Sequence, residues 1–313
     1  MVKEPVFSKI SPGGQVLLLI ALVLAGTIFS IVAAYGISML VWGKEFVTQA
    51  ASGQIISLGF LRTFQIINQI GIFIFPPIAF AWLISEGPLN FLGISKPRAG
   101  QMILAIIAVL SIAPLINVLV QWNEGLTLPH MFHGIENWMR NTEENAARLT
   151  ENFLNAGNPA DLALNLLMIG ILPALGEELL FRPAFIGVLK KMFRNVHWPV
   201  MISAIVFSAF HLQFFGFFPR LVLGILMGYL YVWSGSLWVP ALAHFVNNSV
   251  VVVVSWLFQN QFIKKNLTDL EGAGSWPYVA ISVVLTALVM TGVYISGKRG
   301  RDMETNPEIN HTM

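Results

Sequence analysis

The feature of this sequence that most limits its fold is a series of long apolar runs. Residues 16–42, "VLLLIALVLAGTIFSIVAAYGISMLVW", contain no charged side chain. About 20 consecutive apolar residues are enough for a helix to cross the hydrocarbon core of a bilayer. Charged residues make up 11% of the 313 positions, whereas a soluble domain carries about 25%. Because the runs are long and unbroken rather than short and alternating, they predict transmembrane helices and not a transmembrane barrel.

We therefore expect an all-α, polytopic membrane helical bundle of about eight transmembrane helices. Their predicted ranges are 14–42, 64–85, 101–121, 162–188, 198–217, 219–234, 236–258 and 276–297. Eight spans place both termini on one side, which then holds ten of the 18 Lys and Arg residues, against seven on the other side and Arg182 within a span. Basic residues concentrate on the cytoplasmic side. This pattern predicts cytoplasmic termini in a multi-pass protein of a bacterial inner membrane, with the first run retained as an uncleaved span.

The sequence divides into five predicted segments. They are an N-terminal three-span membrane segment (1–121), an extracytoplasmic loop with a short surface helix (122–161), a membrane core with the candidate site (162–258), a loop and last span (259–297) and a disordered cytoplasmic tail (298–313). The loop contains "HMFH", in which His130 and His133 have a spacing that could hold a metal, although solvated histidines are the favoured interpretation. With no cysteine and a net charge of +2, the chain has no thiolate metal site and no sign of a nucleic-acid partner.

The stretch "GEELLFRP", residues 176–183, places three charged groups inside the fourth predicted span. Ionisable residues at membrane depth are costly, and they pair with each other, line a cavity or serve a function. Glu178 and Arg182 are four residues apart, so they share a helical face and can form an ion pair. Glu177 is rotated from Glu178 by about 100° and must find another partner. The ion pair explains two of the three charges, and Glu177 needs a separate explanation.

Three further polar residues are predicted at a similar depth. Counted along a helix from the cytoplasmic end of each span, Glu177 and His211 lie about 20 Å deep, and His244 and Asn248 lie at roughly 12 to 18 Å. His244 and Asn248 are four residues apart and share a helical face, as do Phe207 and His211, which lets the phenyl ring wall the imidazole. Four polar groups from three helices in one slab favour a functional site over a hydrogen-bond network that only joins helices.

These residue types suit amide hydrolysis. A carboxylate beside an imidazole can activate a water molecule. Burial raises the pKa of the acid and lowers that of the imidazole, so both pKa values move towards neutral pH, where general-base catalysis works best. A histidine and an asparagine on one helical face can donate two hydrogen bonds to a developing oxyanion. The sequence thus indicates a hydrolase with its site sunk in the membrane and reached from the cytoplasm.

The three motifs resemble those of a known family. "EELLFR" fits EExxxR, "FSAFH" fits FxxxH and "HFVNN" fits HxxxN, each on its own apolar span and in this order. Over about residues 160–260 the chain resembles the CPBP family, which unites type II CAAX prenyl endopeptidases and bacteriocin-processing (Abi) proteins. The resemblance implies a glutamate-type intramembrane endopeptidase with eight core helices. In it Glu177 and His211 would activate water, His244 and Asn248 would stabilise the oxyanion, and Glu178, Arg182 and Phe207 would support them.

The resemblance implies a peptide or protein substrate in the bilayer and no cofactor, and it leaves prenylation of that substrate open. Three alternatives remain. Glu177, His211 and His244 could instead hold a catalytic zinc ion, although HExxH is absent and Asn248 is a poor zinc ligand. The chain could be a non-enzymatic membrane partner or bacteriocin-immunity protein that binds a peptide in the same place. A proton-coupled transporter is the third alternative, but a second broken helix in an inverted repeat is missing.

Overall fold

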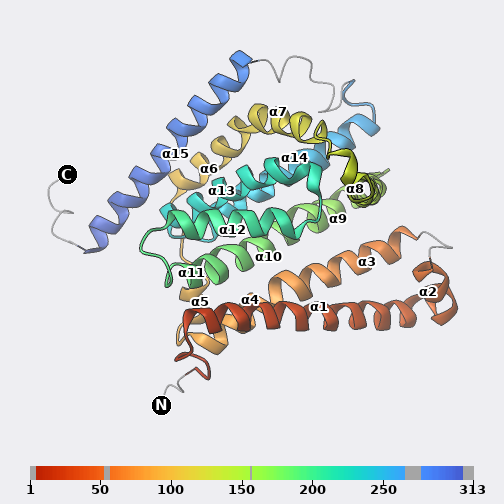
Figure 1. Cartoon of the computed structure of the whole chain (residues 1–313), viewed down its shortest axis with the longest axis horizontal. Coiled ribbons are helices and arrows are strands. Elements are labelled where there is room, and N and C mark those ends of the chain that lie inside the picture. The colour runs from red at the N-terminus through yellow and green to blue at the C-terminus, as the bar shows by residue number, and fades with distance from the viewer. Residues whose placement is uncertain (1–4, 53–56, 156, 265–275, 306–313) are drawn as a thin grey trace. The chain divides into compact units, whose positions relative to one another are not determined.

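In the computed structural model all regular secondary structure of the described residues is helical (Figure 1). The description covers residues 5–52, 57–155, 157–264 and 276–305, and side chains only as far as residue 299. Within these described ranges, seven helical segments are long and apolar enough to cross a membrane, and one further apolar helix is shorter. The seven are Pro12–Trp42, Leu58–Ile84, Ala99–Glu124, Pro159–Leu189, Phe214–Ser234, Trp238–Gln259 and Trp276–Arg299. The predicted fold class, an all-α polytopic membrane bundle, is confirmed.

The helices belong to two compact units, each described by itself. Unit 1 comprises Met1–Leu92, Ala146–Arg194 and Asn248–Thr268, and unit 2 comprises Gly93–Asn145, Asn195–Asn247 and Asp269–Met313. Unit 1 contains α1 (Pro12–Trp42), α2 (Lys44–Ala51), α3 (Leu58–Gln69), η1 (Ile70–Ile74), α4 (Phe75–Ile84), α5 (Pro88–Phe91), α9 (Pro159–Asn165), η3 (Leu166–Ile171), α10 (Leu172–Leu179), η4 (Leu180–Ile186) and α11 (Gly187–Leu189). Unit 2 contains α6 (Ala99–Ser111), α7 (Ala113–Glu124), η2 (His130–Phe132), α12 (His197–Phe210), η5 (Phe214–Gly216), α13 (Phe217–Ser234) and α15 (Trp276–Thr305). The boundary between the units falls within α8 (His133–Leu154) and within α14 (Trp238–Gln259).

The described helices of unit 1 include three π-helices, each beside a proline. Pro76 and Pro77 follow η1, Pro173 follows η3 and Pro183 lies inside η4. Proline cannot donate to the carbonyl four residues before it, and its ring crowds that carbonyl, so the wider π turn accommodates it without ending the helix. The consequence for the site is local, because η3 and η4 flank α10, the helix that carries Glu177 and Glu178.

Small residues allow the helices of unit 1 to pack closely. A Cβ atom added to Gly26 of α1 would lie 2.1 Å from the carbonyl oxygen of Gly71 in η1, and one on Gly71 would lie 2.4 Å from Ser30 Cβ. A Cβ atom on Gly176 of α10 would lie 2.8 Å from Phe73 Cβ in η1. Close backbone approach at small residues is the usual way for membrane helices to gain dispersion energy without a hydrophobic driving force. Gly26 and Gly176 thereby bring α1 and α10 against the same short segment, η1.

The core of unit 2 consists of apolar side chains from four helices, α6, α13, α14 and α15, and from Ile112, which follows α6. Its buried members are Ala105, Ala108, Val109, Ile112, Leu226, Met227, Leu230, Val239, Ala243, Val289, Met290 and Val293. Helix α12 packs along α13 (Figure 1), and the contact is tight because a Cβ on Gly228 would lie 2.8 Å from Val200 Cγ1. This packing holds α12, the helix that leads to His211, within unit 2.

Three predicted segments differ from the structure. The fifth span was expected over 198–217, but α12 ends at Phe210, where Leu212 adopts a left-handed backbone with φ 52°. The surface helix is longer than expected, since α8 has 22 residues. The last helix, α15, continues to Thr305, into the predicted disordered tail, because Lys, Arg, Met and Glu extend an existing helix readily. The remainder of that tail, 306–313, lies outside the described residues.

Two glycines of α1 give a matched pair for testing the close packing. Gly26→Ala places a methyl group against Gly71, and we expect a loss of about 1–3 kcal/mol of stability from overpacking. Gly36→Ala serves as the control, since nothing lies within 4 Å of its added Cβ, and alanine gains about 1 kcal/mol of helix propensity over glycine. Thermal unfolding of both variants in detergent measures the difference, and equal melting temperatures would contradict the packing.

Candidate functional site

The residues predicted to form the site are divided between the two units. Unit 1 holds the carboxylates of α10, Arg182 and Asn248, whereas unit 2 holds Phe207, His211 and His244. Glu177, Glu178, Arg182 and His244 are buried, and His211 and Asn248 are half-buried.

The predicted ion pair of the first motif is present and fully buried. Arg182 Nε donates to Glu178 Oε2 at 2.6 Å, and Arg182 Nη2 donates to Glu178 Oε1 at 3.3 Å, so the contact is bidentate. Both side chains have no exposed surface. Such a pair costs several kcal/mol in desolvation for each ion and is maintained by good geometry. The pair fixes the rotation of the helix, and with it the direction of the neighbouring Glu177.

Glu177 contacts a residue that the sequence analysis did not identify. Gln69 Nε2, at the end of α3, donates to Glu177 Oε1 at 3.4 Å, and both residues are buried. The approach of α10 to η1 at Gly176, immediately before Glu177, brings the two helices close enough for this contact. The signal in the sequence is a polar amide inside an apolar span, a feature that in membrane helices commonly serves packing between helices. Gln69 instead orients the carboxylate of the candidate acid.

Asn248 caps a backbone carbonyl that a proline leaves without its usual donor. Pro173 has no N–H, so it cannot bond the carbonyl of Ile169, four residues earlier. Asn248 Nδ2 donates to that carbonyl oxygen at 3.0 Å. The hydrogen bond ties α14 to η3, and it orients the carboxamide of Asn248 next to the helix of the first motif.

The ring of Phe207 contacts both histidines of unit 2. Its contact with His211 is the one that the spacing of four residues predicts. Its ring centroid is 5.0 Å from that of His211 and 6.2 Å from that of His244, with edge-to-face geometry in both cases. His211 Nδ1 is 2.9 Å from the carbonyl oxygen of Phe207. A carbonyl only accepts hydrogen bonds, so Nδ1 carries the proton and Nε2 is the basic nitrogen of the neutral ring. The Phe207 carbonyl therefore favours the Nδ1–H tautomer of the His211 ring.

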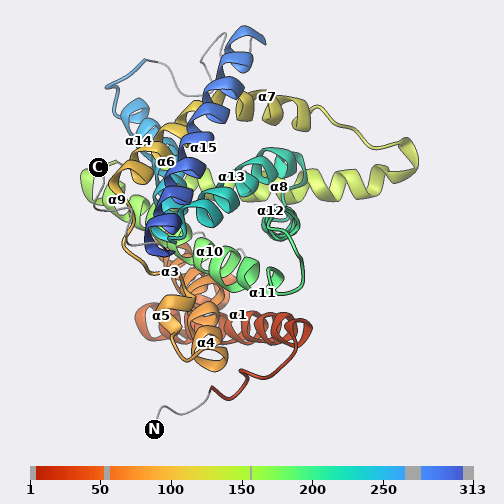
Figure 2. The same ribbon diagram turned by 90° about the vertical axis from the view of Figure 1, so that its left-hand side faces the viewer.

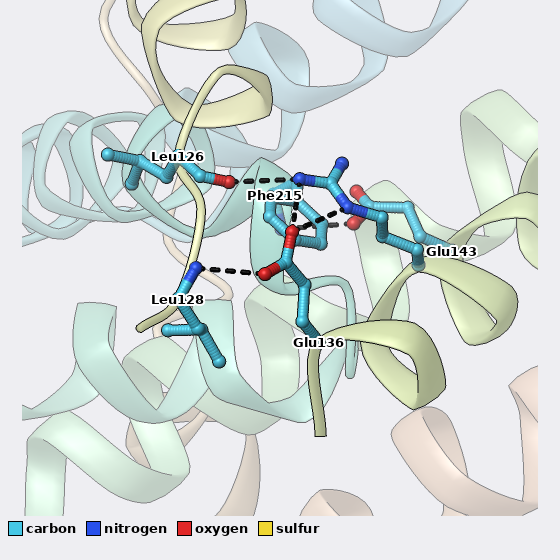
Figure 3. Close-up of polar contacts among 6 residues, drawn as sticks. Leu126, Leu128, Glu136, Glu143 and Phe215 are labelled. Atoms are coloured by element: carbon cyan, nitrogen blue, oxygen red, sulfur yellow. Dashed lines mark hydrogen bonds and ion pairs between the residues drawn. The ribbon is translucent and has the colours of Figure 1, made fainter. Parts of the chain in front are cut away.

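A polar network on α8 holds the chain that follows His211 (Figure 3). Glu136 Oε1 accepts from Arg140 Nε at 3.0 Å and from Arg140 Nη2 at 2.8 Å, and Glu136 Oε2 accepts from the backbone N–H of Leu128 at 2.9 Å. Arg140 also donates to the carbonyl of Leu126, and its guanidinium lies 4.2 Å from the centroid of the Phe215 ring. The Arg140 hydrogen bond, followed by the Leu128 N–H, lowers the pKa of Glu136 below its ordinary value.

The same network reaches η5 directly. Glu143 Oε2 accepts from the backbone N–H of Phe215 at 3.0 Å (Figure 3). Asn123, at the end of α7, donates to the carbonyl of Phe214 and accepts from the N–H of Phe218. The short turn between His211 and α13 is thus anchored by side chains of α7 and α8.

The histidines of "HMFH" are both exposed, and their rings stack with centroids 6.1 Å apart. Among the described residues no cluster of three or more His, Asp or Glu side chains suits a metal ion.

Comparison with known proteins places the motifs in one matched segment. Residues 159–250 match the family model described as type II CAAX prenyl endopeptidase Rce1-like, and all the predicted site residues lie within them. A stretch of 90 residues, 28% of this chain, is 30% identical to the uncharacterized protein YpbD of Bacillus subtilis (strain 168). The match spans 43% of that relative's length. No solved structure matches the chain significantly.

The buried ion pair can be tested by a double-mutant cycle. Glu178→Gln leaves Arg182 buried without its counter-ion, and we expect a loss of about 3–5 kcal/mol. The double variant Glu178→Gln, Arg182→Met removes both charges, so it should be more stable than Glu178→Gln alone. The cycle is completed by the wild type and Arg182→Met, and the melting temperatures of the four proteins in detergent give the coupling between the two side chains. Losses of stability that simply add would be inconsistent with the pair.

The network on α8 predicts a pH dependence of stability. The pKa of Glu136 is lowered from 4.5 in the folded protein. A lowered pKa stabilises the fold above the unfolded-state value, and this contribution is lost as the pH falls through the folded-state pKa. The melting temperature of Glu136→Gln should therefore fall below that of the wild type near neutral pH and approach it below pH 4.5. Glu144→Gln, at an exposed position of the same helix, is the control, and a pH-independent difference would exclude the titration of Glu136.

Proposed function

We propose that this chain is an intramembrane endopeptidase, on the premise that residues 159–250 match the family model described as type II CAAX prenyl endopeptidase Rce1-like. Its reaction is the hydrolysis of a peptide bond by water that side chains activate. The single observation that supports this proposal best is the occurrence of three intact motifs, EExxxR, FxxxH and HxxxN, within the matched segment.

We assign the activation of water to Glu177 and His211. The hydrogen bond from Gln69 orients the carboxylate of Glu177. The contact of His211 Nδ1 with the Phe207 carbonyl places the proton on Nδ1, so that Nε2 is the nitrogen that would accept a proton from water. In this assignment the acid and the imidazole together remove a proton from water as its oxygen attacks the carbonyl carbon, and they return a proton to the leaving amine.

We assign the stabilisation of the tetrahedral oxyanion to His244 and Asn248. They lie four residues apart on α14, so their side chains share a helical face. Two donors placed where negative charge develops stabilise the transition state more than the substrate, and removal of one such donor costs about 10²–10³-fold in rate. The Asn248 bond to Ile169 supports the assignment, because it orients the carboxamide in advance.

The remaining motif residues support these groups. Glu178 and Arg182 fix the rotation of α10 through their buried pair, and the ring of Phe207 contacts both imidazoles in edge-to-face geometry. Gln69 joins this supporting set.

The proposed substrates are peptides or proteins that reach the site within a membrane, and the proposal extends to prenylated and to unprenylated chains. We propose water activated by side chains alone, without a cofactor. A zinc-dependent variant of the same reaction would use Glu177, His211 and His244 as ligands. If a chelator abolished cleavage and added Zn²⁺ restored it, the zinc-dependent variant would be correct and the metal-free mechanism would be wrong.

Two substitutions test the catalytic assignment. Glu177→Gln keeps the size of the side chain and its contact with Gln69, and His211→Ala removes the base, so each should lower cleavage by about 10²–10⁴-fold. The assay incubates purified full-length protein in detergent with matched peptides, farnesylated and unmodified at one cysteine, and identifies products by mass spectrometry.

Glu144→Gln is the control and should retain full activity, since its side chain is exposed on α8. Unchanged cleavage by Glu177→Gln would refute the assignment. An absence of cleavage by the wild type, together with peptide binding that is equal in Glu177→Gln, would favour the non-enzymatic binding partner.

A further inference from the structure

The first half of α8 has its polar face turned inwards to the protein. Glu136, Arg140 and Glu143 follow one another at spacings of four and three residues and therefore share one helical face. This face makes the hydrogen bonds to the 126–128 loop and to η5, all within unit 2. The charges of this part of the helix are thus satisfied by the chain itself.

The exposed surface of the first half of α8 and of the preceding η2 carries an apolar stripe, whereas the charged side chains lie on the inward face. We define the stripe as Met131, Phe132, Ile135 and Trp138, which are 81%, 41%, 51% and 55% exposed. Ile135 and Trp138 are three residues apart and share one face of α8, and Met131 and Phe132 precede them in η2. A helix on the surface of a soluble protein turns its apolar stripe to the core and its charges to water. The first half of α8 does the reverse, which fits an apolar environment outside it.

The stripe continues into an aromatic cluster at the end of a membrane span. The ring of Trp138 lies 5.4 Å from that of Phe214, and the ring of Trp122 lies 5.0 Å from that of Phe218. Trp122 is 51% exposed and lies in the last turn of the span Ala99–Glu124. Tryptophan is enriched where membrane spans meet the interface, so the cluster indicates the depth at which α8 begins.

The direction of α8 agrees with this depth. In Figure 1 α8 is seen nearly end-on while α12 is seen from the side, and in Figure 2 the two views are exchanged. The first half of α8 therefore runs across α12, the shorter apolar helix of unit 2, as a helix lying in the plane of a membrane does.

We infer that the first half of α8 is an interfacial helix, with the stripe inserted between the acyl chains and the headgroups of the bilayer. The occupant of the stripe is lipid. The internal polar network makes this possible, because it removes the charges of α8 from the surface that enters the bilayer. The four residues of the stripe then contact lipid and not the water of an extracytoplasmic loop.

Nitroxide accessibility tests this inference on the full-length protein in lipid nanodiscs. The sequence has no cysteine, so Ile135→Cys gives a single labelling site on the stripe. Glu144→Cys is the aqueous control, since it lies nine residues on, two and a half turns away, and is exposed. Leu110→Cys is the lipid control, since it is 50% exposed within a membrane span. The measurement compares the collision of each label with oxygen, which partitions into lipid, and with a water-soluble nickel complex.

We expect the ratio of oxygen to nickel collisions at Ile135→Cys to be several-fold higher than at Glu144→Cys and close to that at Leu110→Cys. Met131→Cys is a second position on the stripe and should give the same result. A ratio at both stripe positions equal to that of Glu144→Cys would overturn the inference, because the stripe would face water. Protection of both positions from both reagents would also overturn it, because a protein would then cover the stripe.

Discussion

The ion pair between Glu178 and Arg182 is the constraint on which the arrangement of the candidate acid depends. Both side chains are without exposed surface, and a single charge in that position would cost several kcal/mol or more. The two residues must therefore stay on one helical face, one turn apart. That requirement fixes the rotation of α10, and Glu177 lies about 100° away from Glu178 around the helix. The helix meets Gln69 there, so the structural pair determines where the remaining carboxylate points.

Prolines and glycines of unit 1 give this helix its surroundings. Pro173 frees the Ile169 carbonyl that Asn248 bonds, and Gly176 permits the approach to η1 that brings Gln69 to Glu177. The π-helices on either side of α10 absorb the distortion that the prolines cause. Residues that would weaken a helix in water are thus used here to expose backbone groups and to shorten distances between helices. Polar side chains from other helices then bond the groups that become available.

Local spacing predicted the parts of the site that lie within one helix. Glu178 with Arg182 and Phe207 with His211 are each four residues apart, and the structure has both contacts. Contacts between helices could not be predicted from the sequence, because hydropathy indicates that a span exists but not how it is rotated or which helices lie beside it. Gln69 and the Ile169 carbonyl were missed for this reason. The inward charges of α8 could not be predicted either, because the segment was expected to be a surface helix of an aqueous loop, and one of their partners, the N–H of Phe215, lies 72 residues further along the chain.

The length of α12 has a consequence for the bilayer around it. Fourteen residues at 1.5 Å per residue span about 21 Å, roughly 9 Å less than the hydrocarbon thickness of a typical bilayer. Hydrophobic mismatch of this size is relieved by thinning of the lipid layer or by entry of polar groups into it. The helix ends at Phe210, immediately before His211. Either response shortens the apolar barrier between water and the imidazole of His211. The short length of α12 would therefore allow water to reach this side chain.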